Sequence, residues 1–367
     1  MSRAQQLAAK GGQTYTDSPK GISTKNPNGA GGGGDGQAGI RGQRRRLSVV
    51  SDNKLIEGLQ EMGMGEQDAG VAAVGHHTDK HAIDSYAGVS KKGYAPYNPR
   101  KKNQDSIVMF EPPAFPADIF LGTLDGHGEA GDHVSQFMVK NFQAEVSKHP
   151  SYKADPAKAI AETFASVEKR VLKDGTIDTD FSGTTMVVGL IRNNTLYTAN
   201  VGDSRLILGK EVNGKIVAHE VSIDHKPDAP EEKKRILAAG GRVFAVEYDD
   251  GIDGPARVWL GHMDVPGLAM SRSYGDSVAH SAGVTSIPEN FVTDLTSENF
   301  KYLVVATDGL WEFMDNACVM GIVAKHGTDC AAAVKELVEE ANRRWMREEQ
   351  VVDDTTVVVA NVVCHKA

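Results

Sequence analysis

An aspartate that ends an apolar run is the first feature of this sequence that suggests chemistry. The run IFLGTL, residues 119–124, stops at Asp125, and the next residues are Gly126, His127 and Gly128. One interpretation is a polar turn, in which such residues are common. The other is a site at a strand end that uses a carboxylate, an imidazole and a backbone carbonyl that a ligand can approach because glycine has no side chain.

Other aspartates also stand where predicted strands begin or end. They are Asp105, Asp203, Asp308, Asp353 and Asp354. Any one of them could be a turn residue or a helix cap. Carboxylates that converge repel one another unless a cation neutralises them. Hard divalent ions such as Mg²⁺ and Mn²⁺ prefer oxygen ligands, and the sequence lacks the paired His and Cys ligands that zinc prefers. The set therefore indicates a site for divalent metal ions.

Converging carboxylates of this kind are suited to metal-assisted hydrolysis of phosphate esters. Two ions roughly 3.5–4 Å apart can share one carboxylate and activate the water between them. The leaving alkoxide then needs a proton, which an imidazole can supply because its pKa lies near neutrality. In this interpretation Asp125 would bridge two ions, the Gly126 carbonyl would bind one of them, and His127 would be the acid. The alternative for His127 is a hydrogen bond that only holds a loop.

The elements that would position these residues are helices placed between blocks of strands. Helical patterns cover residues 129–149, 155–175, 229–241, 316–327 and 329–350. Strand patterns, with Asn193-Asn194 and Asn213-Gly214 as turns, cover residues 183–191, 195–202, 204–222, 301–309 and 355–363. This order is not the regular alternation of a doubly wound sheet, and no Gly-x-Gly-x-x-Gly follows a strand. It predicts an α+β domain with sheets inside and helices outside.

Composition predicts a folded domain that follows an unstructured region. Residues 1–52 are rich in Gly, Gln, Ser and Asn, which predicts a disordered tail. Residues 53–84 are an extension whose structure the sequence leaves open, and the globular domain is expected at residues 85–367. Near the end of the tail, the sequence RRRLS places arginines just before Ser48. Basophilic kinases favour that arrangement, although a solvated basic patch is an equal interpretation.

Charge, hydropathy and cysteine content argue against several classes of protein. The formal net charge of the 367-residue chain is -9, which argues against binding nucleic acid by bulk electrostatics. No apolar run reaches about 18 residues, so no membrane span is expected, and no secretory signal is recognised. The cysteines Cys318, Cys330 and Cys364 form no Cys-x-x-Cys pair and suggest reduced thiols in an intracellular protein. We therefore expect the protein in the cytoplasm and/or nucleus; its oligomeric state is open, with a monomer as the default.

Eight segments of the sequence match one known family in the order in which that family has them. They are NQDS (103–106), LDGHGEAGDHVS (124–135), FSGTTMVVGLI (181–191), ANVGDSRLIL (199–208), SIDHKPDAPEEKKRILAAGGRV (222–243), PGLAMSRSYGD (266–276), VVATDGLWEFM (304–314) and DDTTVVVANV (353–362). On these segments the chain resembles the metal-dependent protein serine/threonine phosphatases of type 2C, in particular plant and protist members. The resemblance implies a four-layer sandwich of two central, mostly antiparallel sheets flanked by helices.

The resemblance also implies a reaction and its cofactors. Phosphoserine and phosphothreonine in protein substrates would be hydrolysed by a metal-bridged water, without a phosphoenzyme. Two Mg²⁺ or Mn²⁺ ions per active site are implied, and a weaker third ion. The corresponding metal ligands in this sequence are Asp125, Gly126, Asp308 and Asp353, with Asp180 for the third ion. Gln104 stands where many members have a glutamate that positions the second ion through water.

Three residues are the catalytic candidates. Arg100, five residues before Asp105, corresponds to the arginine that holds the substrate phosphate, and a guanidinium fork suits that role. His127 corresponds to the proposed general acid, and Asp105 belongs to the carboxylate set. Residues 226–262 correspond to a variable flap beside the cleft that bears on substrate choice. Glu312 stands where an aspartate is commoner, and it keeps the charge.

Other functions fit the sequence less well. No cysteine is followed by an arginine six residues later, and the Asp-x-Asp pattern of aspartyl-phosphate enzymes does not occur at Asp125. A two-metal nuclease would need a basic groove, whereas this chain is acidic. The remaining alternative is a catalytically weak protein of the same fold that binds phosphoproteins or acts as a scaffold. Gln104 is the feature that favours it, and metal-dependent turnover would separate the two.

Overall fold

The structure is a computed structural model that describes residues 73–76, 82–248 and 251–363. The tail at residues 1–52, with its RRRLS motif, lies outside the described residues. Within the predicted extension at residues 53–84, the described part supplies one short strand and the start of another. No helix of the described residues is long and apolar enough to cross a membrane.

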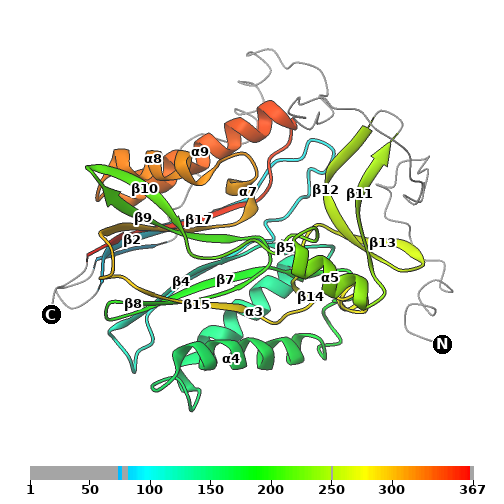
Figure 1. Ribbon diagram of the computed structural model, residues 1–367, viewed down its shortest axis with the longest axis horizontal. Helices are drawn as coiled ribbons and strands as arrows, with labels where there is room; N and C mark the ends of the chain where they lie inside the picture. Colours follow the sequence, from blue (N-terminus) through cyan, green and yellow to red (C-terminus); the bar gives the residue numbers. More distant parts are fainter. Residues whose placement is uncertain (1–72, 77–81, 249–250, 364–367) are drawn as a thin grey trace, which may run out of the picture.

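Two large antiparallel sheets form the centre of the molecule (Figure 1). The six-stranded sheet has the order β1(Ala73–His76), β2(Ile83–Lys91), β17(Thr355–Val362), β16(Phe300–Ala306), β9(Arg205–Val212) and β10(Lys215–Glu220). The five-stranded sheet has the order β15(Glu289–Asp294), β8(Thr195–Val201), β7(Met186–Arg192), β4(Asp118–Leu124) and β3(Ser106–Phe110). All strand pairs within both sheets are antiparallel.

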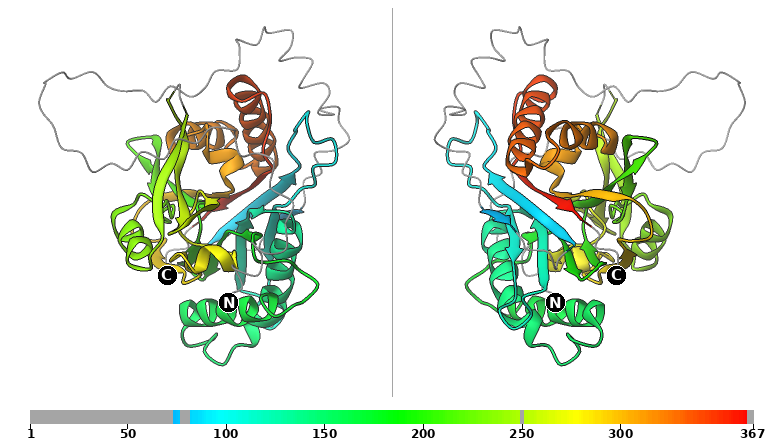
Figure 2. Two further views of the ribbon diagram at one scale, coloured as in Figure 1. Left: turned by 90° about the vertical axis from the view of Figure 1, so that its right-hand side faces the viewer. Right: turned by 90° about the vertical axis from the view of Figure 1, so that its left-hand side faces the viewer.

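Helices cover the outer face of each sheet, and Figure 2 shows the two helix layers at opposite ends of the stack. The helices α3(Gly131–Glu145) and α4(Pro156–Val171), with a 3-10 turn η1(Val146–Lys148) between them, pack on the five-stranded sheet. The helices α8(Asn316–His326) and α9(Cys330–Glu348) pack on the six-stranded sheet. The predicted α+β four-layer sandwich is therefore confirmed.

A hydrophobic core lies between the two sheets and joins them. Leu121 and Val187 from the five-stranded sheet meet Val305 and Val358 from the six-stranded sheet, and all four side chains are fully buried. Burying one such side chain contributes roughly 1.5–3 kcal/mol. Because β4 packs directly against β16 and β17, the ends of these three strands lie close together. This arrangement brings their terminal residues to one edge of the sandwich.

Local signals in the sequence set several element boundaries as expected. The Asp155 side chain caps α4 by accepting a hydrogen bond from the Lys158 N–H at 3.0 Å, and Pro156 is the first helical residue. The β9–β10 hairpin turns at Asn213 and Gly214, whose φ angles are 51° and 75°. These positive angles are what a tight hairpin turn needs.

Two smaller sheets lie near one end of the sandwich. One has the order β14(Tyr274–Gly275), β6(Gly183–Thr184) and β5(Gly126–His127). The other is the hairpin sheet β11(Arg242–Tyr248), β12(Gly251–Leu260) and β13(Met263–Leu268), which falls largely within the flap expected at residues 226–262 (Figure 1). The short helices α5(Pro230–Ala238), α6(Ser277–His280) and α7(Asp308–Trp311) complete this end of the molecule.

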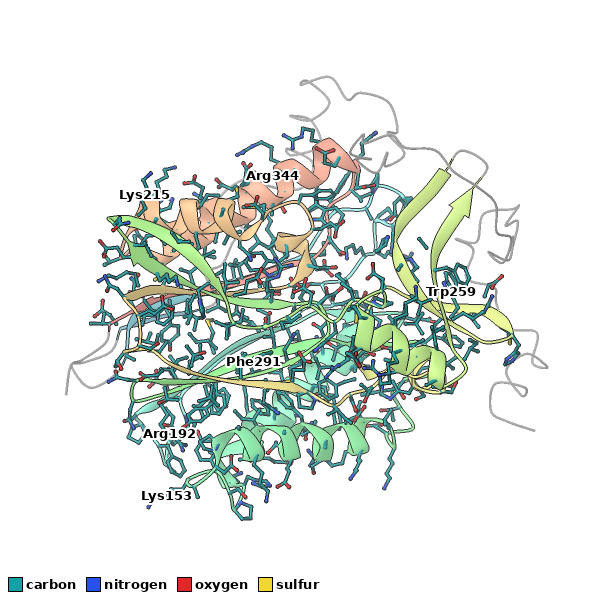
Figure 3. The ribbon with its side chains drawn as sticks, in the orientation of Figure 1. Lys153, Arg192, Lys215, Trp259, Phe291 and Arg344 are labelled. Atoms are coloured by element: carbon teal, nitrogen blue, oxygen red, sulfur yellow. The ribbon has the colours of Figure 1, made fainter. Side chains whose placement is uncertain are left out.

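A buried ion pair anchors the opposite end of strand β4. Arg192 donates from Nε and Nη2 to the two oxygens of Asp118, at 2.9 and 2.7 Å, and the Tyr152 hydroxyl donates to the same carboxylate at 2.7 Å. Arg192 also reaches the backbone carbonyl of Lys153, which Figure 3 places beside it. Charge-assisted, forked contacts of this kind are among the stronger hydrogen bonds in proteins.

Candidate active site

Four of the predicted carboxylates gather at one edge of the sandwich, and they come from both sheets. Asp125 follows β4 and Asp105 precedes β3, whereas Asp308 follows β16 and Asp353 precedes β17. The carboxyl groups of Asp125 and Asp308 are close enough to share a hydrogen bond. The charges of Asp105 and Asp353 also act on Asp125. The expectation that strand ends bring these residues together holds for all four.

Burial and mutual repulsion disfavour the ionised forms of three members of this cluster. The pKa of Asp125 is raised well above its ordinary value by burial and then by the charge of Asp308. The pKa of Asp105 is raised by burial and the charge of Asp354. Burial, Asp203 and Asp353 raise the pKa of Asp308 to about 7. Such shifts mark a place where a positive charge would be stabilising.

Hydrogen bonds hold Asp105 in the middle of this cluster. The Thr307 hydroxyl donates to one of its oxygens at 2.8 Å, and the Thr356 N–H in turn donates to the Thr307 hydroxyl. The other oxygen of Asp105 is buried and has no hydrogen-bond partner in the described part of the chain, and the same is true of one oxygen of Asp308. Buried polar atoms are normally paired, so these two oxygens point to a missing positive partner.

The neighbouring aspartates Asp353 and Asp354 have different surroundings. The carboxylate of Asp354 is 4% exposed and accepts hydrogen bonds from the backbone N–H groups of Gly93 and Gln104, at 2.7 and 2.9 Å. Asp353 is 47% exposed and faces the outside. The Lys101 ammonium lies 3.3 Å from Asp353 and 3.0 Å from Asp354. Asp354 is thus a structural carboxylate, whereas Asp353 is open to a ligand.

A second lysine lies on the far side of the cluster. The Lys226 ammonium donates to Asp203 at 2.6 Å, and Asp203 is 2% exposed. Burial opposes the charge on Lys226, but Asp203 and then Asp308 raise its pKa well above the ordinary value. Lys226 is therefore a permanent cation that partly offsets the negative charge around Asp308.

His127 and Gln104 are both fixed by hydrogen bonds at the turn after β4. His127 Nε2 lies 2.7 Å from Asp276 Oδ2. Burial is the largest single influence on the pKa of His127 and would lower it, but the charge and hydrogen bond of Asp276, together with the charges of Asp203 and Asp308, outweigh burial and the net shift is upward. Gln104 Nε2 donates to the Gly128 carbonyl at 2.6 Å, a bond that a glutamate carboxylate could not donate. Gly126 has no room for a side chain, because a Cβ atom there would lie 2.4 Å from the Gln104 carbonyl oxygen.

Two further predicted site residues stand in loops and are not among the four gathered carboxylates. Arg100 is exposed in the loop between β2 and β3 and forms no ion pair with another described residue. Asp180 is half-buried in the loop before β6, where its carbonyl accepts a hydrogen bond from the Val278 N–H at 3.2 Å. The charge of Asp180 is not among the main influences on Asp125 or Asp308.

The chemistry of this donor set fits divalent metal ions. All four gathered side chains offer oxygen, the ligand that Mg²⁺ and Mn²⁺ prefer, and two buried oxygens among them lack partners within the described ranges. The described residues contain no group of three or more His, Cys, Asp or Glu side chains already closed around a common point. The ligands are therefore gathered at one edge without forming a finished cage, and backbone oxygens or water would complete it.

Several residues at this site carried no assigned role in the sequence analysis. Lys101, Lys226 and Asp276 each contact the cluster or its histidine through side chains from distant segments. Lys226 and Asp276 stand in segments shared with the resembled family, which could have singled them out, whereas Lys101 lies outside those segments. A separate surface pocket lies at the other end of β16 and β17, lined by residues that include Glu298, Lys301 and Asn361, and it contains none of the predicted site residues.

Comparison with known proteins gives consistent matches. The family model described as protein phosphatase 2C matches residues 103–349. "Probable protein phosphatase 2C 35" of Arabidopsis thaliana is 33% identical over 296 residues, which cover 76% of this chain and 83% of that protein. "Probable protein phosphatase 2C 72" of the same plant is 34% identical over 271 residues, covering 70% of this chain and 80% of that protein. The crystal structure of a serine-threonine phosphatase 2C from Toxoplasma gondii shares the fold, with a TM-score of 0.67 and 20% identity over 80% of this chain and 100% of that chain.

Proposed function

The chain belongs to the protein phosphatase 2C family and is a serine/threonine protein phosphatase, and from this premise we propose that its reaction depends on metal ions held by the gathered carboxylates. Asp125, Asp308 and Asp353 would hold two Mg²⁺ or Mn²⁺ ions, with the Gly126 carbonyl as a further ligand. The observation that carries the proposal is the convergence of four aspartates from two sheets. Asp105, Asp125 and Asp308 have raised pKa values, and Asp105 and Asp308 each have an unpartnered buried oxygen. A weaker third ion would bind at Asp180.

Other residues of this chain would bind the substrate phosphate, donate a proton to the leaving oxygen and position the metal ligands. When bound, the two ions would make water nucleophilic and neutralise charge on the phosphate. Arg100 is exposed and has no ion-pair partner among the described residues, so its guanidinium is available to hold the substrate phosphate. His127 would donate a proton to the serine or threonine oxygen as it leaves. Asp105 would keep the ligands in place through its bonds across the two sheets.

Metal-dependent release of phosphate from a phosphothreonine peptide tests this proposal directly. We expect turnover in the presence of Mn²⁺ or Mg²⁺ and none after chelation. Substituting Arg100→Ala should raise KM for the peptide about tenfold or more, because a charge-assisted phosphate contact contributes roughly 1.5–3 kcal/mol. Turnover that is unchanged by chelation would contradict the metal-ion assignment.

The alternative of a phosphoprotein-binding scaffold rests on Gln104. In the structure the Gln104 amide donates to the Gly128 carbonyl, which supports the turn that carries His127. This contact gives Gln104 a structural role, so the presence of glutamine at this position does not by itself favour an inactive protein. Phosphopeptide binding without turnover by well-folded protein at millimolar metal would favour the scaffold.

Three further expectations extend the proposal beyond the described site. Phosphorylated proteins would be the substrates, a basophilic kinase would act at Ser48, and the protein would work as a monomer in the cytoplasm and/or nucleus. The sequence RRRLS supports the kinase assignment, and Ser48 itself lies outside the described residues. Identical activity and binding of Ser48→Ala and of kinase-treated wild type would count against a regulatory role for Ser48.

A further inference from the structure

Asp276 contacts His127 although the two residues are 149 positions apart in the sequence. Its carboxylate oxygen Oδ2 lies 2.7 Å from His127 Nε2, and the residue is 2% exposed. A buried carboxylate in contact with a partly buried imidazole is costly unless the pair is well oriented. The structure around Asp276 must therefore orient its carboxylate toward His127, and the backbone geometry shows how it does so.

The small sheet β14-β6-β5 brings the two residues together across a glycine. His127 and Gly275 are both cross-strand partners of Gly183, the central residue. A Cβ atom on Gly183 would lie 2.1 Å from Asp276 Oδ2, the same oxygen that contacts His127. The carboxylate thus crosses the space that any other residue at position 183 would fill.

The backbone of Asp276 is held in an unusual conformation. Its φ angle is 44°, which is uncommon for a residue with a side chain. Two hydrogen bonds fix this geometry, from the Asp276 N–H to the Ser182 carbonyl and from the His280 N–H to the Asp276 carbonyl, both at 3.0 Å. Strained residues held by their surroundings concentrate at functional sites.

The second nitrogen of the His127 ring has no partner of its own among the described residues. Nδ1 is buried and has no hydrogen-bond partner among the described residues, whereas Nε2 is occupied by Asp276. One ring nitrogen of His127 is therefore engaged by Asp276, and the other is unengaged.

We propose that Asp276 is a positioning residue that holds His127 by Nε2, so that Nδ1 delivers the proton to the leaving oxygen. This inference rests on the proposed function. In the step, the water oxygen forms a bond to phosphorus and the phosphorus–oxygen ester bond breaks, with its electron pair on the serine or threonine oxygen. The Nδ1 proton of His127 moves to that oxygen, and the attacking water loses a proton to solvent. The products are the free hydroxyl and inorganic phosphate.

The test compares two substrates that differ in their need for a proton. A phosphothreonine peptide releases an alkoxide, which must be protonated, whereas para-nitrophenyl phosphate releases a stable phenolate. The variants are His127→Gln, Asp276→Ala, Asp276→Asn and the double variant His127→Gln/Asp276→Ala, measured with Mn²⁺. Asp118→Asn is the matched control, because it also disturbs a buried carboxylate paired with a cation, at the other end of β4.

We expect Asp276→Ala to lower the ratio of peptide turnover to aryl phosphate turnover about 100-fold, as His127→Gln does, since general acids contribute about 10²–10⁴-fold. The double variant should lose no more than His127→Gln alone. Asp276→Asn should fall between Asp276→Ala and wild type, because an amide oxygen still accepts from Nε2–H and asparagine tolerates a positive φ. Asp118→Asn should leave the ratio unchanged.

A nuclear magnetic resonance measurement adds a readout that does not need turnover. In the metal-free protein, the Nε2 proton of His127 should give a slowly exchanging, downfield signal that Asp276→Ala removes. Gly183→Ala should remove it as well, because its methyl group displaces the carboxylate. A signal that survives in Asp276→Ala would overturn the contact.

The outcomes separate this inference from the proposed function. If wild type turns over both substrates with metal but Asp276→Ala lowers both rates equally, Asp276 serves only the fold and the positioning role is refuted. An additive loss in the double variant would refute it too. If wild type turns over neither substrate, the proposed function fails, and the inference fails with it.

Discussion

Lys101 forms an ion pair with Asp353 at one end of the carboxylate cluster. Its ammonium lies within 3.3 Å of Asp353, the most exposed of the gathered carboxylates. A cation held this close competes with a metal ion for the same negative charge. Its neighbour Arg100 has no such partner among the described residues, so the two adjacent cations have different roles.

We predict that Lys101→Met binds Mn²⁺ about fivefold more tightly than wild type. Removing one partly exposed ion pair changes the binding free energy by about 1 kcal/mol, here in favour of the metal. Calorimetric titration of the metal-free protein measures the affinity without relying on activity. Lys102→Met is the control, since Lys102 pairs with Asp132 instead. Weaker binding by Lys101→Met would show that Lys101 orients Asp353 for the metal.

The raised pKa of Asp308, about 7, makes the stability of the metal-free protein depend on pH. The folded pKa exceeds the unfolded value of about 4, so the protonated form is the one that folding favours. The contribution of this group to stability is fully present below about pH 4 and is lost as pH rises through 7. We predict that chemical denaturation of wild type shows this loss and that Asp308→Asn shows a flatter dependence. Equal slopes for the two proteins would contradict the assignment.

Single residues could be predicted only where the local pattern carried the information. Asp105, Asp125, Asp308 and Asp353 stand at the ends of apolar runs, and strand ends of packed sheets converge. The roles of Lys101, Lys226 and Asp276 depend on side-chain directions across distant segments. Hydrophobic periodicity contains no information about those directions.

At the scale of elements, strand β4 connects two different charged centres. Asp118 at its first residue is buried with Arg192 and Tyr152, and Asp125 directly after its last residue belongs to the cluster. The first centre fixes the strand against the loop before α4. In the second centre, the end of β4 at Leu124 sets the position of Asp125 in the carboxylate cluster. Stability and chemistry are thus separated along one strand.

We predict that Asp118→Asn lowers the free energy of unfolding by about 3 kcal/mol, because it leaves the partly buried guanidinium of Arg192 without its countercharge. Metal affinity and the peptide-to-aryl-phosphate ratio should stay at their wild-type values. Urea denaturation followed by fluorescence measures the first quantity. A loss of metal binding that exceeds the loss of stability would show that the two ends of β4 are coupled.

Long elements were predictable and short ones were not. The helix patterns at residues 155–175 and 329–350 contain α4 and α9, because their apolar spacing is sustained over several turns. The two-residue strands β5, β6 and β14 carry no periodic signal at all. Their pairing is set by glycines and by contacts from three separate segments, so the sheet that joins His127 to Asp276 could not be expected from the sequence.

At the scale of the whole molecule, a bound metal ion would connect the two halves of the sandwich. Two of the gathered carboxylates come from the five-stranded sheet and two from the six-stranded sheet. Without a cation their mutual repulsion opposes the packing of β4 against β16 and β17. The helix and strand patterns predicted an α+β domain with sheets inside and helices outside, and the resemblance to the family predicted the four-layer architecture.

We predict that Mn²⁺ raises the thermal midpoint of wild type and that the rise grows with pH between 5 and 7.5. A ligand at 100 times its Kd stabilises the folded state by about 2.7 kcal/mol, and the cluster binds metal better as its carboxyls ionise. Asp308→Asn should show little or no rise. A metal effect on wild type that is independent of pH would mean that the ions bind elsewhere.

The most direct test of the central claim is release of phosphate from a phosphothreonine peptide by wild type and Asp308→Asn, with and without Mn²⁺. The account predicts turnover by wild type only when metal is present, and a loss of at least about 100-fold in Asp308→Asn, since removing a ligand forfeits several kcal/mol of transition-state stabilisation. Turnover by wild type without metal, or undiminished turnover by folded Asp308→Asn, would contradict it.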